Sequence, residues 1–246
     1  MKPRNKKGEL TTKQIVTLII LIVSFIVILF FIFRLNLKEK TDKEICRNSV
    51  VLRDQGKIFS GPLDCKTNYL CLYSKKECSE FFTEKIKIEK LEKTELMKHI
   101  AEEMADCRWM FGEDKKLRYT GGSTSTGVDC AICSIISFDE EIQNKIPEIS
   151  YKEFYNFLEK NSLEEGESYL KYLYDVDSLS SLQIQEQFSN INIDEDIIRT
   201  SEKYSIITGI DNNLIDILDD DEWLNVYLIP TKETSQTKCS NFITKA

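Results

Sequence analysis

The longest apolar stretch of the chain covers residues 15–33 and reads IVTLIILIVSFIVILFFIF. It contains no charged residue, no proline and no glycine, and its only polar interruptions are Thr17 and Ser24. A helix rises about 1.5 Å per residue, so this stretch spans about 28 Å, close to the bilayer hydrocarbon thickness of about 30 Å. The pattern therefore predicts a transmembrane helix that anchors the protein to a lipid bilayer.

Basic residues lie on both sides of this stretch. Five precede it and four follow it: Lys2, Arg4, Lys6, Lys7 and Lys13, then Arg34, Lys38, Lys40 and Lys43. The shallow excess at the N-terminal side predicts that residues 1–14 form a cytoplasmic tail and that the rest of the chain lies outside. A cleaved secretory signal is disfavoured, because the stretch exceeds the usual hydrophobic region of about 7–15 residues and no small-x-small site follows it.

The N-terminal residues also resemble those of a known class of exported proteins. Lys7, Gly8 and Glu9, followed by an unbroken apolar helix, resemble the class III prepilin signals of archaeal pilin-like proteins, which are cut after the glycine. Lys13 stands where pilins usually place an acidic residue. The whole chain, an anchor followed by an acidic domain that contains cysteines, is similar to uncharacterised archaeal single-pass membrane proteins. The first resemblance implies processing after Gly8, and the second implies no activity.

The chain after the predicted anchor divides into three parts. Residues 34–44 are expected to form a charged juxtamembrane linker with little tendency to fold. Residues 45–80 are expected to form a small Cys-rich segment with a short strand at 49–52 and a turn at 60–62. So small a piece needs covalent closure or docking to bury a core, and the main domain is expected over residues 81–246.

A helical pattern begins the main domain. Leu96, Ile100, Met104 and Cys107 recur at i, i+4, i+8 and i+11, within a region that extends over residues 81–111. Thr94 is expected to cap its start and Gly112 to end it. This segment is predicted to be the central core helix, with Cys107 bridging to a strand or to the C-terminal tail.

The remaining pattern mixes strands and helices. Residues 131–138 read as a strand, and Ser150 with Glu153 forms a capping box that predicts the start of a helix. Residues 204–210 and 226–229 read as two further strands. No regular βαβ repeat connects these elements, so we expect one α+β domain with a mainly antiparallel sheet and two or more packed helices.

Charge is distributed unevenly along the chain. Residues 1–133 carry 24 basic and 18 acidic side chains, whereas residues 134–246 carry 9 basic and 23 acidic ones. An acidic surface repels nucleic-acid phosphates, so DNA or RNA binding is not expected of the main domain.

All eight cysteines follow the predicted anchor. They are Cys46, Cys65, Cys71, Cys78, Cys107, Cys130, Cys133 and Cys239, and all eight are candidates for disulfide bonds. An even number confined to the presumed exterior is typical of an oxidised framework. Four of them lie within residues 46–78 and four in the remainder, so pairing within each group would leave nine possible connectivities.

Two alternative roles of the cysteines remain open. Cys130 and Cys133 have the CxxC spacing of thiol oxidoreductases, but those place the pair at a helix N-terminus, whereas these residues read as part of a strand. Zinc would require further ligands from Cys107, Cys239 or the single histidine, His99. A lone histidine beside a helical core stripe is more often structural than catalytic.

Two other segments have compositions found in binding sites. Residues 121–127 are rich in glycine, but no Lys-Ser or Lys-Thr follows them, so they are interpreted as a loop and not as a phosphate-binding loop. Residues 211–222, DNNLIDILDDDE, are the best candidate for a calcium site, but they lack the EF-hand spacing and are interpreted as a solvated turn.

The sequence thus predicts a single-pass cell-membrane protein with a disulfide-stapled extracytoplasmic domain. We expect a structural or binding role without enzymatic activity, and the expected partner is the bilayer, through residues 15–33. No catalytic, cofactor-binding or metal-binding residue is assigned, and neither ligand nor protein partner is indicated. The alternatives are a pilin-like surface filament subunit and a CxxC thiol-disulfide oxidoreductase.

Overall fold

The computed structural model divides the chain into two units, residues 1–41 and residues 42–246. It describes residues 12–34, 37–55, 63–78, 81–112, 127–163, 166–182, 191–211 and 223–244. The Lys7-Gly8-Glu9 sequence and the turn expected at 60–62 lie outside these ranges. Residues 45–80 and 81–246, expected as separate parts, both belong to the second unit.

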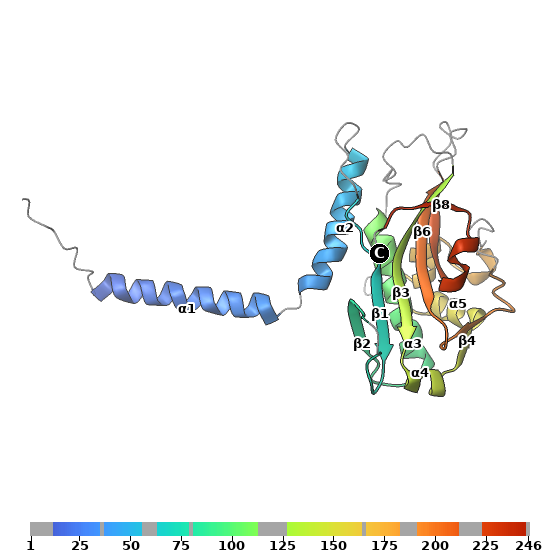
Figure 1. Ribbon diagram of the computed structural model, residues 1–246, viewed down its shortest axis with the longest axis horizontal. Helices are drawn as coiled ribbons and strands as arrows, with labels where there is room; N and C mark the ends of the chain where they lie inside the picture. The colour runs from blue at the N-terminus through green and yellow to red at the C-terminus, as the bar shows by residue number, and fades with distance from the viewer. Residues whose placement is uncertain are drawn as a thin grey trace, which may run out of the picture. The chain divides into compact units, whose positions relative to one another are not determined.

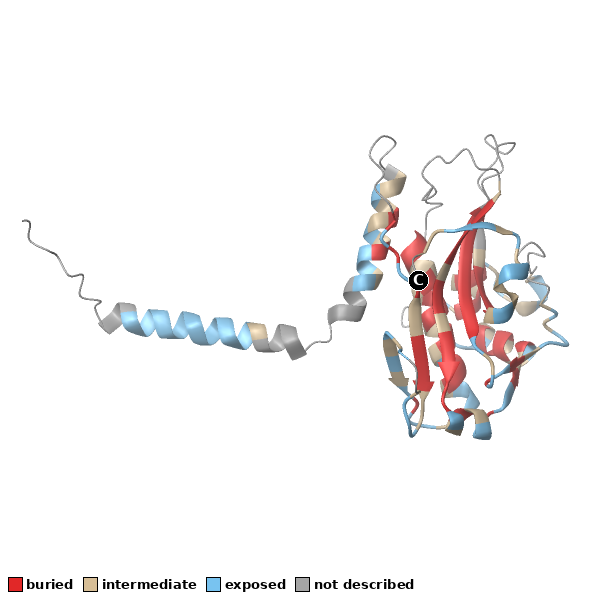
Figure 2. Cartoon of the chain, viewed as in Figure 1, coloured by how far each residue is buried: buried red, intermediate tan, exposed pale blue. Residues whose placement is uncertain are grey.

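Helix α1 (Thr12–Arg34) covers the apolar stretch. Its side chains are described over residues 15–29, where all except Thr17 and Ser24 are apolar and residues 15–28 are solvent-exposed, as Figure 2 shows. Over the residues that the structure describes, no helix meets the combined length and hydropathy of a membrane span. The transmembrane assignment of residues 15–33 therefore remains a prediction.

Helix α2 (Leu37–Gln55) replaces two elements that the sequence suggested. It begins inside the expected linker, and it contains the residues 49–52 that were expected to form a strand, so the strand prediction was wrong. Cys46 and Val50 lie one helical turn apart, and both are buried. Burial of this one face outweighs the strand preference of the adjacent valines.

The main sheet has six strands and is mixed (Figure 1). The strands are β1 (Asn68–Tyr73), β2 (Glu84–Lys87), β3 (Val128–Phe138), β6 (Tyr204–Asp211), β7 (Trp223–Pro230) and β8 (Cys239–Phe242). The order is β2-β1-β3-β6-β7, with β8 also paired to β3. β1 pairs in parallel with β2 and β3, β8 pairs in parallel with β3, and only β3–β6 and β6–β7 are antiparallel.

The expected mainly antiparallel sheet is therefore corrected to a mixed one. β1 and β8 pair with different halves of β3, β1 with Ser134–Phe138 and β8 with Val128–Cys130. Parallel neighbours need a crossover connection, and helix α3 (Lys93–Gly112) lies in the connection between β1 and β3. This arrangement could not be predicted from the sequence, because β1 and β2 are short and show no clear alternation of apolar and polar residues.

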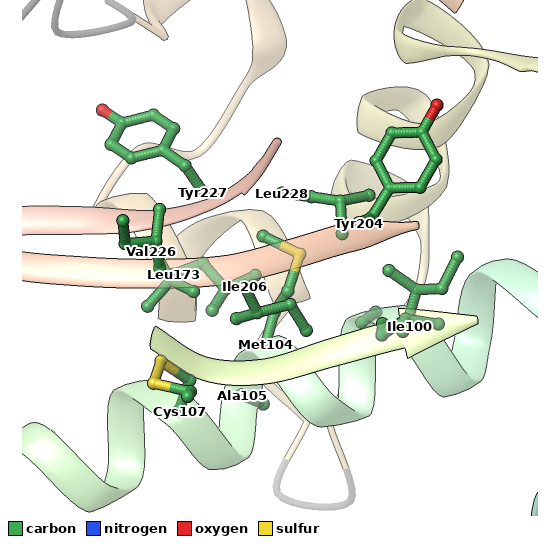
Figure 3. Packing of buried hydrophobic residues seen from close by; sticks show 14 of the residues in the cluster. Ile100, Met104, Ala105, Cys107, Leu173, Tyr204, Ile206, Val226, Tyr227 and Leu228 are labelled. Carbon is green, nitrogen blue, oxygen red and sulfur yellow. A yellow bond between two sulfur atoms is a disulfide. The ribbon is translucent and has the colours of Figure 1, made fainter. Parts of the chain in front are cut away.

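Helix α3 packs against the sheet as its hydrophobic stripe predicts. Leu96, Ile100, Met104 and Cys107 are all fully buried, and Gly112 ends the helix with a positive φ of 119°. Figure 3 shows Met104 beside Ile206 of β6, and Ile100 further along α3, toward Tyr204. The helix starts at Lys93, one residue before the expected cap at Thr94, whereas residues 84–87, at the start of the region expected to be helical, form strand β2.

Three shorter helices and a second sheet complete the domain. The helices are α4 (Glu140–Lys145), α5 (Tyr151–Lys160) and α6 (Tyr169–Tyr174), and the two-stranded sheet is β4 (Glu148–Ser150) with β5 (Ile197–Arg199). Short 3-10 turns occur at η1 (Leu179–Ser181) and η3 (Thr231–Gln236). The Ser150 hydroxyl accepts a hydrogen bond from the Glu153 amide at 3.0 Å, so the predicted helix start is confirmed.

Tyrosine side chains cover the outer edge of β7. The hydroxyl of Tyr174 donates to the carbonyl of Val226 at 2.8 Å, and that of Tyr151 donates to the carbonyl of Leu228 at 3.0 Å. The hydroxyls of Tyr155 and Tyr174 are 3.1 Å apart. An edge strand leaves a row of backbone groups without partners, and these hydroxyls satisfy two of its carbonyls.

Candidate functional site

All eight cysteines form disulfide bonds, and none is free. The pairs are Cys46–Cys65, Cys71–Cys78, Cys107–Cys133 and Cys130–Cys239. Each pair stays within one of the two groups into which the sequence divides the cysteines. The disulfide framework is therefore confirmed, and the Cys107 bridge goes to a strand, β3, as one of the two expected alternatives.

The two cysteines of the CxxC sequence do not pair with each other. Cys130 bonds to Cys239 of β8, whereas Cys133 bonds to Cys107 of α3. Both residues lie on β3, as the β-branched residues around them predict. A redox-active pair needs an exposed thiolate at a helix N-terminus, and these two cysteines are almost fully buried. Cys130 and Cys133 therefore form no disulfide with each other, which the oxidoreductase alternative would need for thiol-disulfide exchange.

A cluster of charged and polar side chains joins α2 to α3 and to the sheet. The Lys43 ammonium lies 2.9 Å from the Glu103 carboxylate and 2.7 Å from that of Asp106. Glu103 is 3% exposed and also accepts hydrogen bonds from Asn68 of β1 and Ser134 of β3. Glu84 of β2 lies 3.8 Å from the same ammonium. Four elements therefore meet at one buried carboxylate.

Burial and neighbouring charges act in opposite directions on the groups of this cluster. Burial alone would lower the pKa of Lys43, but the carboxylates of Glu103, Asp106 and Glu84 outweigh it and raise that pKa above its ordinary value. Burial raises the pKa of Asp106, and Lys43 opposes that shift. A buried carboxylate that accepts from two neutral donors and one cation is a satisfied structural group, so we interpret the cluster as a structural contact between α2, α3 and the sheet.

A second contact fixes the same helix to the end of α3. The Arg47 guanidinium donates to the carbonyl of Trp109 at 2.7 Å and lies 4.4 Å from the centre of the Trp109 ring. A cation is favourable at a helix C-terminus, and a guanidinium over an indole adds a cation–π contact. Together with the Cys46–Cys65 bond, these contacts fasten residues 43–50 firmly to the rest of the domain.

His99 has a local structural role in α3. Its Nδ1 atom lies 3.1 Å from the Glu102 carboxylate, one turn further along the same helix. The hydrogen bond from His99 is the main cause that lowers the pKa of Glu102. Within the described part of the chain, no group of three or more His, Cys, Asp or Glu residues is placed to hold a metal ion. The acidic residues 212–222 and the glycine-rich residues 121–126 lie outside the described residues.

A cavity of about 460 Å³ lies at the carboxyl ends of β1 and β3. Residues 75–78, which follow β1, form one wall, and Ser137 with Phe138 at the end of β3 forms another. Phe82, Asp139, helix α4 and residues 200–203 supply the rest of the lining. Ligand sites are common at the carboxyl ends of parallel strands, and this volume falls in the usual range of small-molecule pockets, about 300–1,000 Å³.

The Asp139 side chain hydrogen-bonds to two of the segments that surround this cavity. One of its carboxylate oxygens accepts from the amides of Ser74 at 2.9 Å and Lys75 at 3.4 Å. The other accepts from the amide of Ile142 at 2.8 Å and caps helix α4. The loop after β1 and the helix after β3 are therefore held by one side chain, which makes the cavity a preformed feature.

Sequence reasoning missed both the cluster and the cavity. Glu103 carries a signal that could have been found, because it occupies a position within the apolar stripe between Ile100 and Cys107. A charged residue at such a position needs a buried partner. The cavity residues come from separate segments with no characteristic spacing, so no local pattern indicates them.

Comparison with protein-family models, with curated proteins and with solved structures finds no match. The fold and the site thus define the class: an α+β domain with a mixed sheet, four disulfide bonds and a preformed cavity beside the parallel strands.

Proposed function

We propose that this chain is a membrane-anchored protein whose disulfide-bonded domain lies outside the cytoplasm and serves a binding role, without enzymatic activity. The observation that carries the proposal is the complete pairing of the eight cysteines, all of which follow the apolar helix. Disulfides persist in oxidising compartments and are rare in the cytosol. An oxidised domain therefore needs a location beyond the membrane.

The anchor is supported by the apolar stretch at residues 15–33. Large apolar side chains of α1 are about half or more exposed, for example Leu21 at 63% and Phe25 at 62%. A contiguous apolar surface of this kind is unfavourable in water and favourable in hydrocarbon. On insertion scales, each central Ile, Leu, Phe or Val contributes about −0.3 to −0.6 kcal/mol.

A binding role is favoured over catalysis by the nature of the two sites. In the Lys43–Glu103 cluster one ammonium is shared by three carboxylates that all lie within 4 Å of it, which suits a structural contact. The cavity at the ends of β1 and β3 is preformed and has space for a small ligand. It lies in the part of the domain held by the Cys71–Cys78 bond, since Cys78 lines it.

Membrane fractionation and protease treatment of intact cells test the anchor and its direction. We expect the full chain to stay with the membrane pellet in alkaline carbonate, and its domain to be cleaved by external protease. Ile22→Lys/Ile26→Lys should release the protein, because each charge at a helix centre costs about 2.5–3.5 kcal/mol. The matched control Ile45→Lys/Leu52→Lys changes two exposed apolar residues of α2 and should leave the protein in the pellet.

Two results would overturn this proposal. The wild-type protein could appear in the carbonate supernatant, or its domain could resist protease until the cells are lysed. N-terminal sequencing of the same material decides the pilin-like alternative, because a chain that begins at Glu9 would favour it and an intact Met1 or Lys2 would eliminate it.

A further inference from the structure

Two of the eight cysteines are less buried than the rest. Cys78 and Cys239 are half-buried, whereas each of the other six is at most 2% exposed. A thiol in solution can therefore approach only two of the four disulfide bonds, Cys71–Cys78 and Cys130–Cys239. Exposed disulfides are typically the labile or regulatory ones, whereas buried cysteines are inert to exchange.

The two accessible bonds differ in their surroundings. The backbone amide of Cys78 donates a hydrogen bond to the Sγ atom of Cys71, with 3.3 Å between the nitrogen and the sulfur. An N–H donor stabilises a thiolate, and a stabilised thiolate is the better leaving group in thiol–disulfide exchange. Among the described residues, no amide donates to either sulfur of Cys130–Cys239. Exposure and a donor to the leaving sulfur thus coincide in Cys71–Cys78.

This bond closes one wall of the cavity at the carboxyl ends of β1 and β3. Cys78 lines the cavity, together with Lys75, Lys76 and Glu77, which lie between the two bonded cysteines. Cys71 is fully buried within β1. A thiol that enters the cavity therefore meets the Cys78 side of the bond.

The rest of this wall is held unevenly. Asp139 accepts hydrogen bonds from the amides of Ser74 and Lys75. Beyond Lys75, the described contacts are the disulfide with its amide hydrogen bond and an ion pair between Glu77 and Lys85, whose side chains are 54% and 39% exposed. An exposed ion pair contributes little to stability. The disulfide is therefore the main attachment of residues 76–78.

We propose that the Cys71–Cys78 disulfide is a redox-sensitive closure of this cavity, opened by a dithiol reductant. One thiolate of the reductant attacks the Cys78 sulfur, the bond between the two cysteines breaks, and Cys71 leaves as a thiolate that takes up a proton. The second thiol of the reductant then displaces Cys78, which takes up the second proton. The reductant is oxidised to a cyclic disulfide, and its two electrons reduce the two cysteines to thiols.

Reduction releases residues 76–78 from the cavity wall, whereas Asp139 keeps residues 74–75 in place. The other three disulfides stay closed, so the domain remains folded while the cavity opens. The inference rests on the oxidised domain and the binding role proposed above, and it adds a means of regulating the same cavity.

Reduction of the full, oxidised chain in detergent micelles with increasing dithiothreitol tests the order of opening. Samples are blocked with N-ethylmaleimide, and mass spectrometry of peptides locates the alkylated cysteines. We expect Cys71 and Cys78 to be alkylated at dithiothreitol concentrations at least about tenfold lower than any other pair. Alkylation of another pair first, or of all four pairs together, would overturn the inference.

Glutathione, a monothiol, identifies the sulfur that is attacked. Because it stops at the mixed disulfide more readily than a dithiol does, the expected product carries glutathione on Cys78 and N-ethylmaleimide on Cys71. Glutathione mainly on Cys71 would contradict the inference, since the attack would then come from the buried side of the bond.

Limited digestion with trypsin measures the opening itself. Cleavage after Lys75 or Lys76 should be at least about fivefold faster once this bond is reduced, and Cys71→Ala/Cys78→Ala should show the same rate without reductant. Cleavage after Lys87 in β2 is the matched control within the same molecule and should not change. If the variant unfolds, cleavage after Lys87 also rises, and the wild type in limiting dithiothreitol then decides.

Equal cleavage after Lys75 and Lys76 in the oxidised and the selectively reduced wild type would overturn the inference. The membrane anchor and the external location would still stand in that case, because fractionation and protease accessibility in intact cells measure them without opening any disulfide.

Discussion

At the scale of single residues, Glu103 is a buried carboxylate held by three hydrogen-bond donors. It is buried beneath α2 and receives hydrogen bonds from Lys43, Asn68 and Ser134. A buried carboxylate destabilises the fold unless its charge is compensated. The cost of removing one of its partners is therefore larger than the net attraction within that one pair. Through Glu103, the side chain of Lys43 connects α2 to both α3 and the sheet.

Lys43→Met should therefore lower the free energy of unfolding by about 2–3 kcal/mol, because it leaves Glu103 buried without its cation. This value is below the usual range for a fully buried pair, since Lys43 is 18% exposed and two neutral donors remain. Urea denaturation of the oxidised protein measures the loss. The control Lys66→Met removes an exposed lysine 4.0 Å from Asp42 and should change stability by less than about 0.5 kcal/mol.

A double-mutant cycle isolates the cause. Lys43→Met/Glu103→Leu removes both members of this pair and should be more stable than Lys43→Met alone, because the most deeply buried carboxylate of the cluster is then absent. If Lys43→Met has the same free energy of unfolding as the wild type, the Lys43–Glu103 cluster does not stabilise the packing of α2 against the domain.

At the scale of elements, the edge of β7 depends on tyrosine hydroxyls. Tyr174→Phe removes the donor to the Val226 carbonyl and the contact with the Tyr155 hydroxyl, in a fully buried setting. We expect a loss of about 1–3 kcal/mol in the free energy of unfolding. Urea denaturation gives the loss, and Tyr172→Phe, in the same helix, should have the smaller effect because Tyr172 is only partly buried. Equal losses of unfolding free energy in Tyr174→Phe and Tyr172→Phe would show that the Tyr174 hydroxyl does not stabilise the edge of β7.

Buried tyrosines at the edge of β7 and on β6 predict a loss of stability at alkaline pH. Burial raises the pKa of Tyr204 from 10.0 to about 12, and burial raises those of Tyr151 and Tyr174 well above 10.0. The folded state keeps protons that the unfolded state releases near pH 10, so the contribution is complete below pH 10 and falls as the pH rises through 12.

An absorbance titration of tyrosinate near 295 nm checks this. The folded protein should ionise part of its tyrosines only well above pH 10, whereas the urea-unfolded protein should titrate in one step near 10. Coincident curves for the two states would show that these side chains are not buried.

The sequence predicted those elements whose signal is local. The stripe from Leu96 to Cys107, the cap at Ser150 and the strands β6 and β7 follow from spacing within a single segment. The strand expected at residues 49–52 became part of α2, because contacts with residues far along the chain decided its conformation. The parallel pairing of β1 with β3 and the cavity depend on such distant contacts too, and a spacing within one segment cannot reveal them.

At the scale of the whole molecule, four disulfides close loops of very different lengths. The sequence separations are 7, 19, 26 and 109 residues. In the chain-entropy account, stabilisation rises with loop length, from about 2 kcal/mol for the shortest to about 5 kcal/mol for the longest. Cys130–Cys239 closes the longest loop and connects strand β8 to β3 at the centre of the sheet. It is therefore expected to contribute most to the free energy of unfolding.

Paired replacement by alanine tests this order. Cys130→Ala/Cys239→Ala should lower the free energy of unfolding by about 4–5 kcal/mol and Cys71→Ala/Cys78→Ala by about 2 kcal/mol. Urea denaturation under non-reducing conditions measures both. A larger loss for the short loop than for the long one would show that chain entropy does not govern the framework.

The central claim is that the domain folds oxidised, on the far side of a membrane from the cytoplasm. Alkylation with a polyethylene-glycol maleimide, applied as cells are lysed in denaturant and read as gel shifts, tests it most directly. The account predicts no additions without reductant and eight additions after reduction, one for each cysteine of the chain. Eight additions without any reductant would contradict it, because they would show a reduced domain in a cytoplasmic environment.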